Sequence, residues 1–215
     1  MSPQRTQEEI KNLALSTIEE YYKNDVPLPI DVEEIMELGL KLKPYILPQL
    51  EAEFSNGGEA FLTAGNRVVV IDESLYTQES RRERLRFSLG HEIGHYILHK
   101  SLFEDIKDID EYLQRMESIK SSVYDRIERE ANSFAGHLLV PIKYLELQIT
   151  DFEKQFVDWD LAYTGTFVED MRKRFECTPT VVAIQCKRSL LKEFSNIGTA
   201  LDQIIQYGKH SGRYF

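Results

Sequence analysis

The residues best equipped for chemistry lie at positions 91–95, which read His-Glu-Ile-Gly-His. On a helix, His91 and His95 are one turn apart and project in the same direction, so their imidazoles can share one tetrahedral cation. Glu92 is rotated by about 100° around the helix axis. It would lie beside that cation, where a carboxylate can act as general base toward a metal-bound water. The spacing predicts a zinc site with Glu92 as the catalytic residue. The competing interpretation is a solvated helix face with paired His and Glu side chains.

A catalytic zinc ion needs a third protein ligand and one open position. A third histidine six residues after His95 is absent, because position 101 is a serine. A later segment offers Glu128, and Asn132 follows it by one helical turn on the same face. We therefore predict that Glu128 is the third metal ligand and that Asn132 hydrogen-bonds a ligand histidine.

Glu130 is the rival for the third ligand position. It is rotated by about 200° from Glu128, so the two carboxylates cannot both face one metal ion. Glu128 borders the apolar stripe of this helix, whereas Glu130 falls further round, toward solvent. Helical phase therefore favours Glu128. The stripe consists of Val123, Ile127, Ala131, Phe134 and Leu138.

Three stretches of the sequence resemble the ImmA/IrrE family of metallopeptidases. They are residues 91–99 (HEIGHYILH), 128–135 (EREANSFA) and 138–141 (LLVP), and with weaker similarity upstream the resemblance covers about residues 6–145. It implies a thermolysin-like zinc core in which Glu128 is a ligand and Asn132 supports a ligand. It also implies a protein substrate, which in this family is usually a DNA-binding repressor, here expected to be of the helix-turn-helix type.

Hydrophobic periodicity predicts a mainly helical α+β fold with a small antiparallel sheet packed on the metal-binding helices. The resemblance implies that the core of this fold is zincin-like. The expected sheet is a hairpin of residues 59–62 and 67–71 around a turn at residues 63–66. Helix starts are indicated where Thr6, Asp31 and Ser80 each precede a glutamate by three positions. The predicted helices cover residues 7–22, 32–38, 81–99, 122–139 and part of 103–120.

The chain is expected to hold a zincin-like metallopeptidase domain over residues 1–145 and a C-terminal extension over residues 146–215. The extension can still pack as part of the same domain. Its pattern predicts a helix over Phe167–Arg174, a strand over Val181–Cys186 and a weaker helix over Ala200–Tyr207.

The composition limits the class of protein. Of 215 residues, 42% are hydrophobic and 29% charged, as in ordinary globular proteins. No apolar run reaches the roughly 20 residues of a membrane span, and the first residues lack the apolar core of an export signal. We therefore expect a cytoplasmic protein with no membrane partner.

A net charge of −10 disfavours direct binding of nucleic acid. Cys177 and Cys186 are too few for a disulfide framework and are expected to be thiols.

Two features of catalysis stay open. The donor that stabilises the oxyanion could be His137, Tyr96 or Tyr144. The substrate is expected to bind as an added strand along residues 67–71 or 59–62.

Other residues receive ordinary structural interpretations. His99 is expected to be a helix-end histidine favoured by the helix dipole, and Gly94 to allow another element to pack closely on the metal helix. The run Arg81-Arg82-Glu83-Arg84-Leu85-Arg86 is expected to be a solvated face, and residues 104–111 a mobile lid or a surface segment.

Two other functions compete with the peptidase hypothesis. The chain could be a catalytically quiet metal-binding regulatory module, or an interaction subunit of a mobile-element or toxin–antitoxin-like operon. The intact Glu92 argues against the first alternative, because a pure binding site has no use for a base. The substrate, its cleavage site, the activating signal and the oligomeric state do not follow from the sequence.

Overall fold

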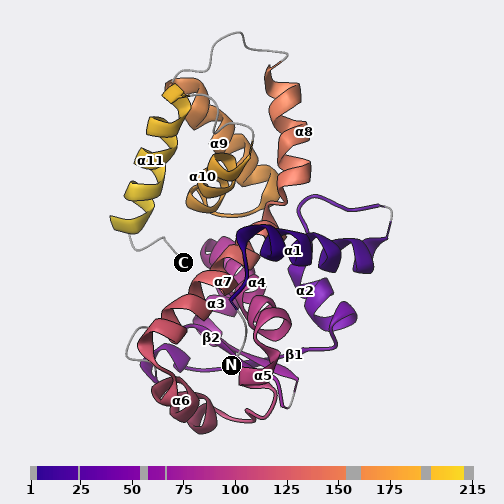
Figure 1. Cartoon of the computed structure of the whole chain (residues 1–215), viewed down its shortest axis with the longest axis vertical. Coiled ribbons are helices and arrows are strands. Elements are labelled where there is room, and N and C mark those ends of the chain that lie inside the picture. The colour runs from indigo at the N-terminus through magenta and orange to yellow at the C-terminus, as the bar shows by residue number, and fades with distance from the viewer. Residues whose placement is uncertain are drawn as a thin grey trace.

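The computed structural model describes residues 4–23, 25–53, 58–65, 67–153, 161–189 and 195–210. A three-stranded sheet and the helices around it form one half of the molecule, and four C-terminal helices form the other (Figure 1). None of the helices formed by these residues combines the length and apolar character that a membrane span requires. The elements are α1 (Gln7–Tyr22), α2 (Val32–Glu34), the π-helix η1 (Ile35–Gly39), β1 (Lys43–Leu47), the 3-10 helix η2 (Leu50–Glu53), β2 (Ala60–Thr63), β3 (Val68–Asp72), α3 (Glu73–Thr77), the 3-10 helix η3 (Glu79–Arg81), α4 (Arg82–Leu98), α5 (Lys100–Phe103), α6 (Ile109–Ser118), α7 (Ser121–Leu139), α8 (Ile142–Glu153), α9 (Leu161–Phe175), α10 (Pro179–Arg188) and α11 (Ser195–His210).

The sheet has the strand order β1-β3-β2. β2 and β3 pair antiparallel, with Phe61 opposite Val70, which confirms the predicted hairpin. The prediction of a wholly antiparallel sheet is wrong, because β1 pairs parallel to β3 and makes the sheet mixed. β1 contains Pro44, which cannot donate a hydrogen bond to a neighbouring strand and is tolerated at a sheet edge. The mainly helical α+β class is confirmed.

Both faces of the sheet are covered. Leu62, Val69 and Ile71 face the main hydrophobic core, which α4 and α7 share with the C-terminal helices. Phe61 and Val70 face a second, smaller cluster on the opposite side, where η2 and α6 pack. In the described part of the chain β3 has a strand on each side, so β1 and β2 are the edge strands.

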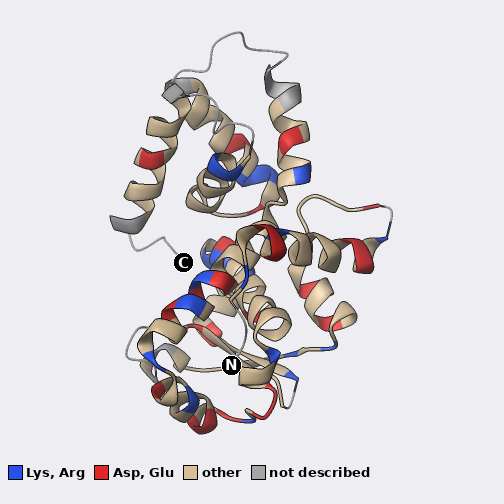
Figure 2. Cartoon of the chain, viewed as in Figure 1, with Lys and Arg blue, Asp and Glu red and all other residues tan. Residues whose placement is uncertain are grey.

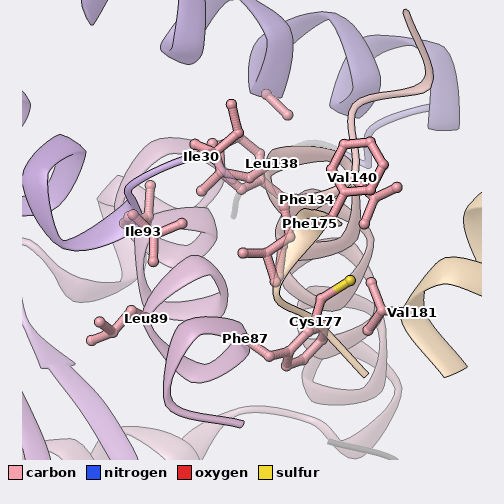
Figure 3. Packing of buried hydrophobic residues seen from close by; sticks show 14 of the residues in the cluster. Ile30, Phe87, Leu89, Ile93, Phe134, Leu138, Val140, Phe175, Cys177 and Val181 are labelled. Atoms are coloured by element: carbon pink, nitrogen blue, oxygen red, sulfur yellow. The ribbon is translucent and has the colours of Figure 1, made fainter. Parts of the chain in front are cut away.

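The helices α4 and α7 lie against each other through small residues. A Cβ atom added to Gly94 would lie 3.2 Å from the Cα and the carbonyl oxygen of Ala131, and one added to Gly90 would lie 3.3 Å from the Cβ of Ala135. The two glycines are one turn apart, as are the two alanines, so they form a continuous seam. The close packing expected at Gly94 is confirmed. Beyond the seam, Phe134 and Leu138 of α7 and Ile93 of α4 fill the core (Figure 3).

Two of the three predicted helix caps are confirmed. Thr6 and Glu9 form a reciprocal capping box at α1, and the Asp31 side chain accepts a hydrogen bond from the Glu34 amide at α2. The prediction for Ser80 is wrong. α4 begins at Arg82 after the 3-10 turn η3 and has no side-chain cap.

The predicted strand over Val181–Cys186 is also wrong, because these residues lie in α10. Thr178 caps this helix by accepting a hydrogen bond from the Val181 amide, and Pro179 occupies its first turn. A capping residue followed by proline is a strong helix start. This signal outweighs the strand preference of the β-branched residues that follow it. The predicted helices near residues 167–174 and 200–207 are confirmed as α9 and α11.

The arginine run at the start of α4 is not a solvated face, contrary to expectation. Arg81 and Arg84 both bind the buried carboxylate of Glu59. Arg86 is 3% exposed and donates hydrogen bonds to the carbonyls of Ile30 (2.7 Å) and Glu176 (2.9 Å). Buried carbonyls and carboxylates need such donors, so these side chains join α4 to the hairpin and to the end of α9.

Replacing Gly94 with alanine is expected to destabilise the protein, because the new methyl group meets backbone atoms of Ala131 that cannot rotate away. We expect a loss of about 1–3 kcal/mol from overpacking, reduced by up to about 1 kcal/mol of better helix propensity. Urea denaturation measures the difference. The matched control is Gly165→Ala in α9, where the added Cβ meets nothing within 4 Å and should stabilise by about 0.5–1 kcal/mol. Equal stabilisation by both substitutions would show that the seam is not tight.

Candidate metal centre

Three side chains that can bind a metal ion converge where α4 and α7 meet. The Nε2 atoms of His91 and His95 are 2.8 Å apart, and each lies 3.3 Å from an oxygen of Glu128. All three donor atoms lie within 4.8 Å of one another, and in the described part of the chain no other group of His, Cys, Asp and Glu side chains is arranged in this way. This cluster could hold a metal ion.

The electrostatics of the cluster favour a cation. Burial alone would lower the pKa of His91, but the hydrogen bond and charge of Glu128, the charge of Glu92 and the hydrogen bond with Asn132 outweigh it and raise that pKa to about 9. Burial would raise the pKa of Glu128, but His95 and His91 hold it far below its usual range. At neutral pH the cluster therefore contains an ionised carboxylate beside a protonated His91, and a metal ion would take the place of that proton.

Asn132 hydrogen-bonds to the ring nitrogen of His91 that does not face the cluster. Its Oδ1 lies 2.8 Å from Nδ1 of His91, so this nitrogen can donate to the amide oxygen and leave Nε2 free to bind a metal. Glu128 and Asn132 lie one turn apart on α7, which interleaves acidic and basic residues along its N-terminal half (Figure 2). The structure thus places both residues where the sequence predicts them.

Glu130 does not face solvent, contrary to expectation. It is 5% exposed, and its Oε2 lies 3.0 Å from Nε2 of His99. Arg126 and the backbone amide of Arg5 each donate to its Oε1 at 3.3 Å. The error has a physical cause: α1 and the residues before it cover the side of α7 that helical phase assigns to solvent.

His99 is more than a helix-end histidine. It is fully buried, and its Nδ1 lies 3.1 Å from Nδ1 of His95. Burial and the neighbouring His95 lower the pKa of His99 to about 4, against the opposing effect of Glu130. The imidazole is therefore neutral at neutral pH, and its contact with Glu130 is a hydrogen bond rather than an ion pair. No spacing rule connects residue 99 to residue 130, so the sequence alone did not reveal the contact.

Glu92 lies beside the cluster, as predicted for the candidate base, and is 4% exposed. Burial raises the pKa of its carboxyl group, as does the charge of Glu128, whereas His91, His95 and the backbone amide of Leu62 act in the opposite direction. Its Oε2 accepts no hydrogen bond from any described residue. A buried carboxylate with a raised pKa and a free oxygen is suited to accept and return a proton.

Comparison with known families decides the class of protein. The Peptidase_M78 family model, described as the IrrE N-terminal-like domain, matches residues 56–186. The chain belongs to this family. The matched span includes α4 and α7 and reaches into α10. Membership confirms the resemblance drawn from the sequence and supports a function of the metallopeptidase type. A search of the curated proteins finds no match.

Of the two edge strands, β2 is the one that packs against α4. Residues 67–71 are excluded as the edge that receives a substrate strand, because β3 is the central strand. Residues 59–62 remain, and the Leu62 amide bonds to Glu92. β2 is thus the strand that lies nearest to the candidate base.

The surroundings of the three expected oxyanion donors do not test that role, which stays a prediction. The hydroxyl of Tyr96 accepts a hydrogen bond from Arg67 at 2.9 Å, and the ring of Tyr144 lies under the ammonium group of Lys143. His137 borders a cavity of about 310 Å³ between α1 and α8.

Tyr112 of α6 is a further tyrosine near the cluster, to which the sequence did not point. Its ring lies 5.0 Å from that of Phe61 and 6.3 Å from that of Phe103, which itself packs on His95. It packs against both hydrophobic clusters. Burial, then the charges of Glu92 and Glu128, raise the pKa of Tyr112 well above 10. Its phenol is thus protonated at neutral pH, and it lies close enough to Glu92 and Glu128 for their charges to raise its pKa.

The segment before α6 is joined to the hairpin by a hydrogen bond, and one of its residues is buried. Ile106 is 1% exposed, and its carbonyl accepts a hydrogen bond from the Gly65 amide at 3.0 Å. A Cβ on residue 65 would lie 2.8 Å from that carbonyl, so the turn of the hairpin requires glycine here. The expectation of a surface segment over residues 104–111 is confirmed for most of its residues, with Ile106 as the buried exception, and a mobile lid stays a prediction.

Metal affinity of this M78 peptidase should fall as the pH is lowered below about 9. The folded-state pKa of His91 is raised to about 9, so below that pH a bound proton must leave before the metal binds, which costs up to about tenfold in affinity per pH unit. Titrations of the metal-free protein with cobalt(II) against a competing chelator, from about pH 6 to about pH 8, measure the slope. An affinity independent of pH over this range would contradict a protonated His91.

Proposed function

We propose that the protein is a zinc-dependent endopeptidase in which His91, His95 and Glu128 bind the metal and Glu92 is the general base. The observation that carries this proposal is the convergence of three donor atoms from two helices with a buried carboxylate beside them. A site that only binds metal gains nothing from a fourth, non-ligating carboxylate of raised pKa.

The donor set fits zinc. Two imidazole nitrogens and one carboxylate are a usual set for catalytic zinc, with a fourth position open to water or substrate. With metal–ligand bonds of about 2.0–2.1 Å, neighbouring donors of a tetrahedral site are roughly 3.3–3.4 Å apart. The distances from Glu128 to His91 and to His95 are both 3.3 Å. The two histidine nitrogens, at 2.8 Å, need only separate by about half an ångström.

The residues of this chain divide the chemistry between them. Zinc, when bound, would supply Lewis acidity toward water and the scissile carbonyl. Glu92 takes the proton from the attacking water and returns it to the leaving amine. Its burial raises its pKa, which makes Glu92 a stronger base for the first transfer than an exposed glutamate would be.

Tyr112 is the hydrogen-bond donor that we assign to the developing oxyanion. Its phenol is protonated, its ring packs on Phe61 of β2, and the charge of Glu92 contributes to its raised pKa. A donor at this position stabilises charge that appears only in the transition state, which raises the rate without tightening substrate binding.

The proposed substrate is a protein segment that binds in extended form along β2. An added strand supplies backbone hydrogen bonds at an open sheet edge, and β2 has such an edge next to Glu92. Following the family resemblance, we propose a helix-turn-helix repressor as the substrate and the cytoplasm as the place of action. Cys177 and Cys186 are free and buried, which fits a reducing compartment.

Replacing Glu92 with glutamine is expected to abolish peptide cleavage while zinc binding is retained, because the amide cannot accept the proton but keeps the shape of the side chain. General-base loss costs about 10²–10⁴-fold in rate. Cleavage of a candidate helix-turn-helix repressor, followed by gel and mass spectrometry, measures it, with zinc content determined in parallel. The exposed Glu79→Gln variant is the matched control and should keep full activity. Cleavage that persists in Glu92→Gln would refute the assigned base, and a zinc-loaded wild type that cleaves no such protein would favour the quiet regulatory module.

Replacing Tyr112 with phenylalanine is expected to lower kcat by about 10²-fold with little change in KM, as for the loss of one oxyanion donor. The ring and its contacts with Phe61 and Phe103 are kept, so folding and zinc content should not change. Steady-state kinetics on the same substrate test this. A loss confined to KM would assign Tyr112 to substrate binding instead.

A further inference from the structure

A buried pair of side chains, His99 and Glu130, stands behind His95. Nδ1 of His99 lies 3.1 Å from Nδ1 of His95, and Nε2 of His99 lies 3.0 Å from Oε2 of Glu130. The two residues are 0% and 5% exposed. They extend the site by two side chains on the side away from the proposed metal position.

The directions of these hydrogen bonds follow from the ligand role of His95, and this step rests on the proposed function. A neutral imidazole that binds zinc through Nε2 must carry its proton on Nδ1. The group facing that proton is Nδ1 of His99, which must therefore accept. Because Nδ1 of His99 accepts, its ring proton is on Nε2, which lies 3.0 Å from a Glu130 carboxylate oxygen that can only accept. One arrangement of protons satisfies every group.

The opposite arrangement is incompatible with metal binding through His95. If His99 carried a proton on Nδ1, the two Nδ1 atoms could bond only with His95 as acceptor. A neutral His95 would then carry its proton on Nε2, the atom that faces Glu128 and His91. We propose that His99 and Glu130 form a positioning pair that holds His95 with its proton on Nδ1 and its Nε2 lone pair directed at the zinc ion.

The pair is itself held in place by two further donors. Arg126, one turn before Glu130 on α7, and the backbone amide of Arg5 both donate to Oε1 at 3.3 Å. Oε2 is left for His99. Glu130 is therefore not the rival of Glu128 for the metal but the acceptor at the end of a chain that supports the other helix's ligand.

The two ligand histidines are supported differently. His91 meets a neutral amide oxygen of Asn132, whereas His95 is connected through an imidazole to a carboxylate. Hydrogen bonding of a ligand histidine to a carboxylate raises its basicity, and loss of such a partner typically costs about 10–100-fold in metal affinity. We expect the His99–Glu130 pair to contribute within this range.

Zinc affinity of the full-length protein tests the pair. The variants are His99→Phe, which keeps an aromatic ring but removes both nitrogens, and Glu130→Gln, which keeps the shape but removes the charge. The matched control is Ser133→Ala, a buried residue of α7 that bonds Gln7 (2.7 Å) and not the histidines. Competition against a chromophoric chelator gives the affinity, and thermal unfolding of the metal-free proteins shows that each is folded.

We expect zinc affinity to fall by about 10–100-fold in His99→Phe and by less in Glu130→Gln, with Ser133→Ala unchanged. The double variant should be no worse than His99→Phe alone, because the two residues act through one chain of hydrogen bonds. The visible spectrum of the cobalt(II)-loaded protein should change in His99→Phe and not in the control. An affinity within about twofold of the wild type in a folded His99→Phe protein, or an equal loss in Ser133→Ala, would overturn the proposal.

A second measurement needs no substitution. Long-range nitrogen–proton NMR spectra of the zinc-loaded wild type distinguish the two neutral tautomers of each histidine. His99 should carry its proton on Nε2 and His95 on Nδ1. A proton on Nδ1 of His99 would refute the positioning role. A wild type that binds no zinc would instead refute the proposed function, so the two failures are distinguishable.

Discussion

The close approach of α4 and α7 is the constraint on which the rest of the site depends. Their backbones meet where Gly90 and Gly94 face Ala135 and Ala131, with no room for a further methyl group at Gly94. Each glycine costs a helix about 1 kcal/mol relative to alanine, and the packing along the seam offsets that cost. Only at this separation can a carboxylate of α7 reach two imidazoles of α4. The geometry of the metal centre thus depends on the glycines and alanines of this seam.

Much of this arrangement could be predicted because it is local. The one-turn spacing of His91 and His95 and that of Glu128 and Asn132 follow from helix geometry, and both pairs lie as that geometry requires. The helices themselves follow from apolar periodicity, and the hairpin from a β-branched run next to a turn. Such signals are contained within a few residues and need no knowledge of the fold.

What could not be predicted depends on distant parts of the chain. Helical phase predicts an exposed Glu130, because it contains no information about α1, which covers this side of α7. β1 pairs in parallel with a strand that follows it by a long connection, and its short run with a proline gives little local signal. The strand expected over Val181–Cys186 failed for another reason: β-propensity is a weak preference, and Thr178 with Pro179 begins a helix. Tyr112 comes to the site from a separate helix at no fixed spacing.

The hydrogen bond from the Arg5 amide to Glu130 links the beginning of the chain to the metal centre. Thermodynamic linkage is reciprocal: if the docked N-terminal segment favours the metal-binding geometry, bound metal favours docking by the same factor. The first turn of α1 would then report on metal occupancy, and protection of its amides from hydrogen exchange would increase with metal loading. A polypeptide fused ahead of Arg5, or a cut made there, would in turn act on the metal centre from a distance.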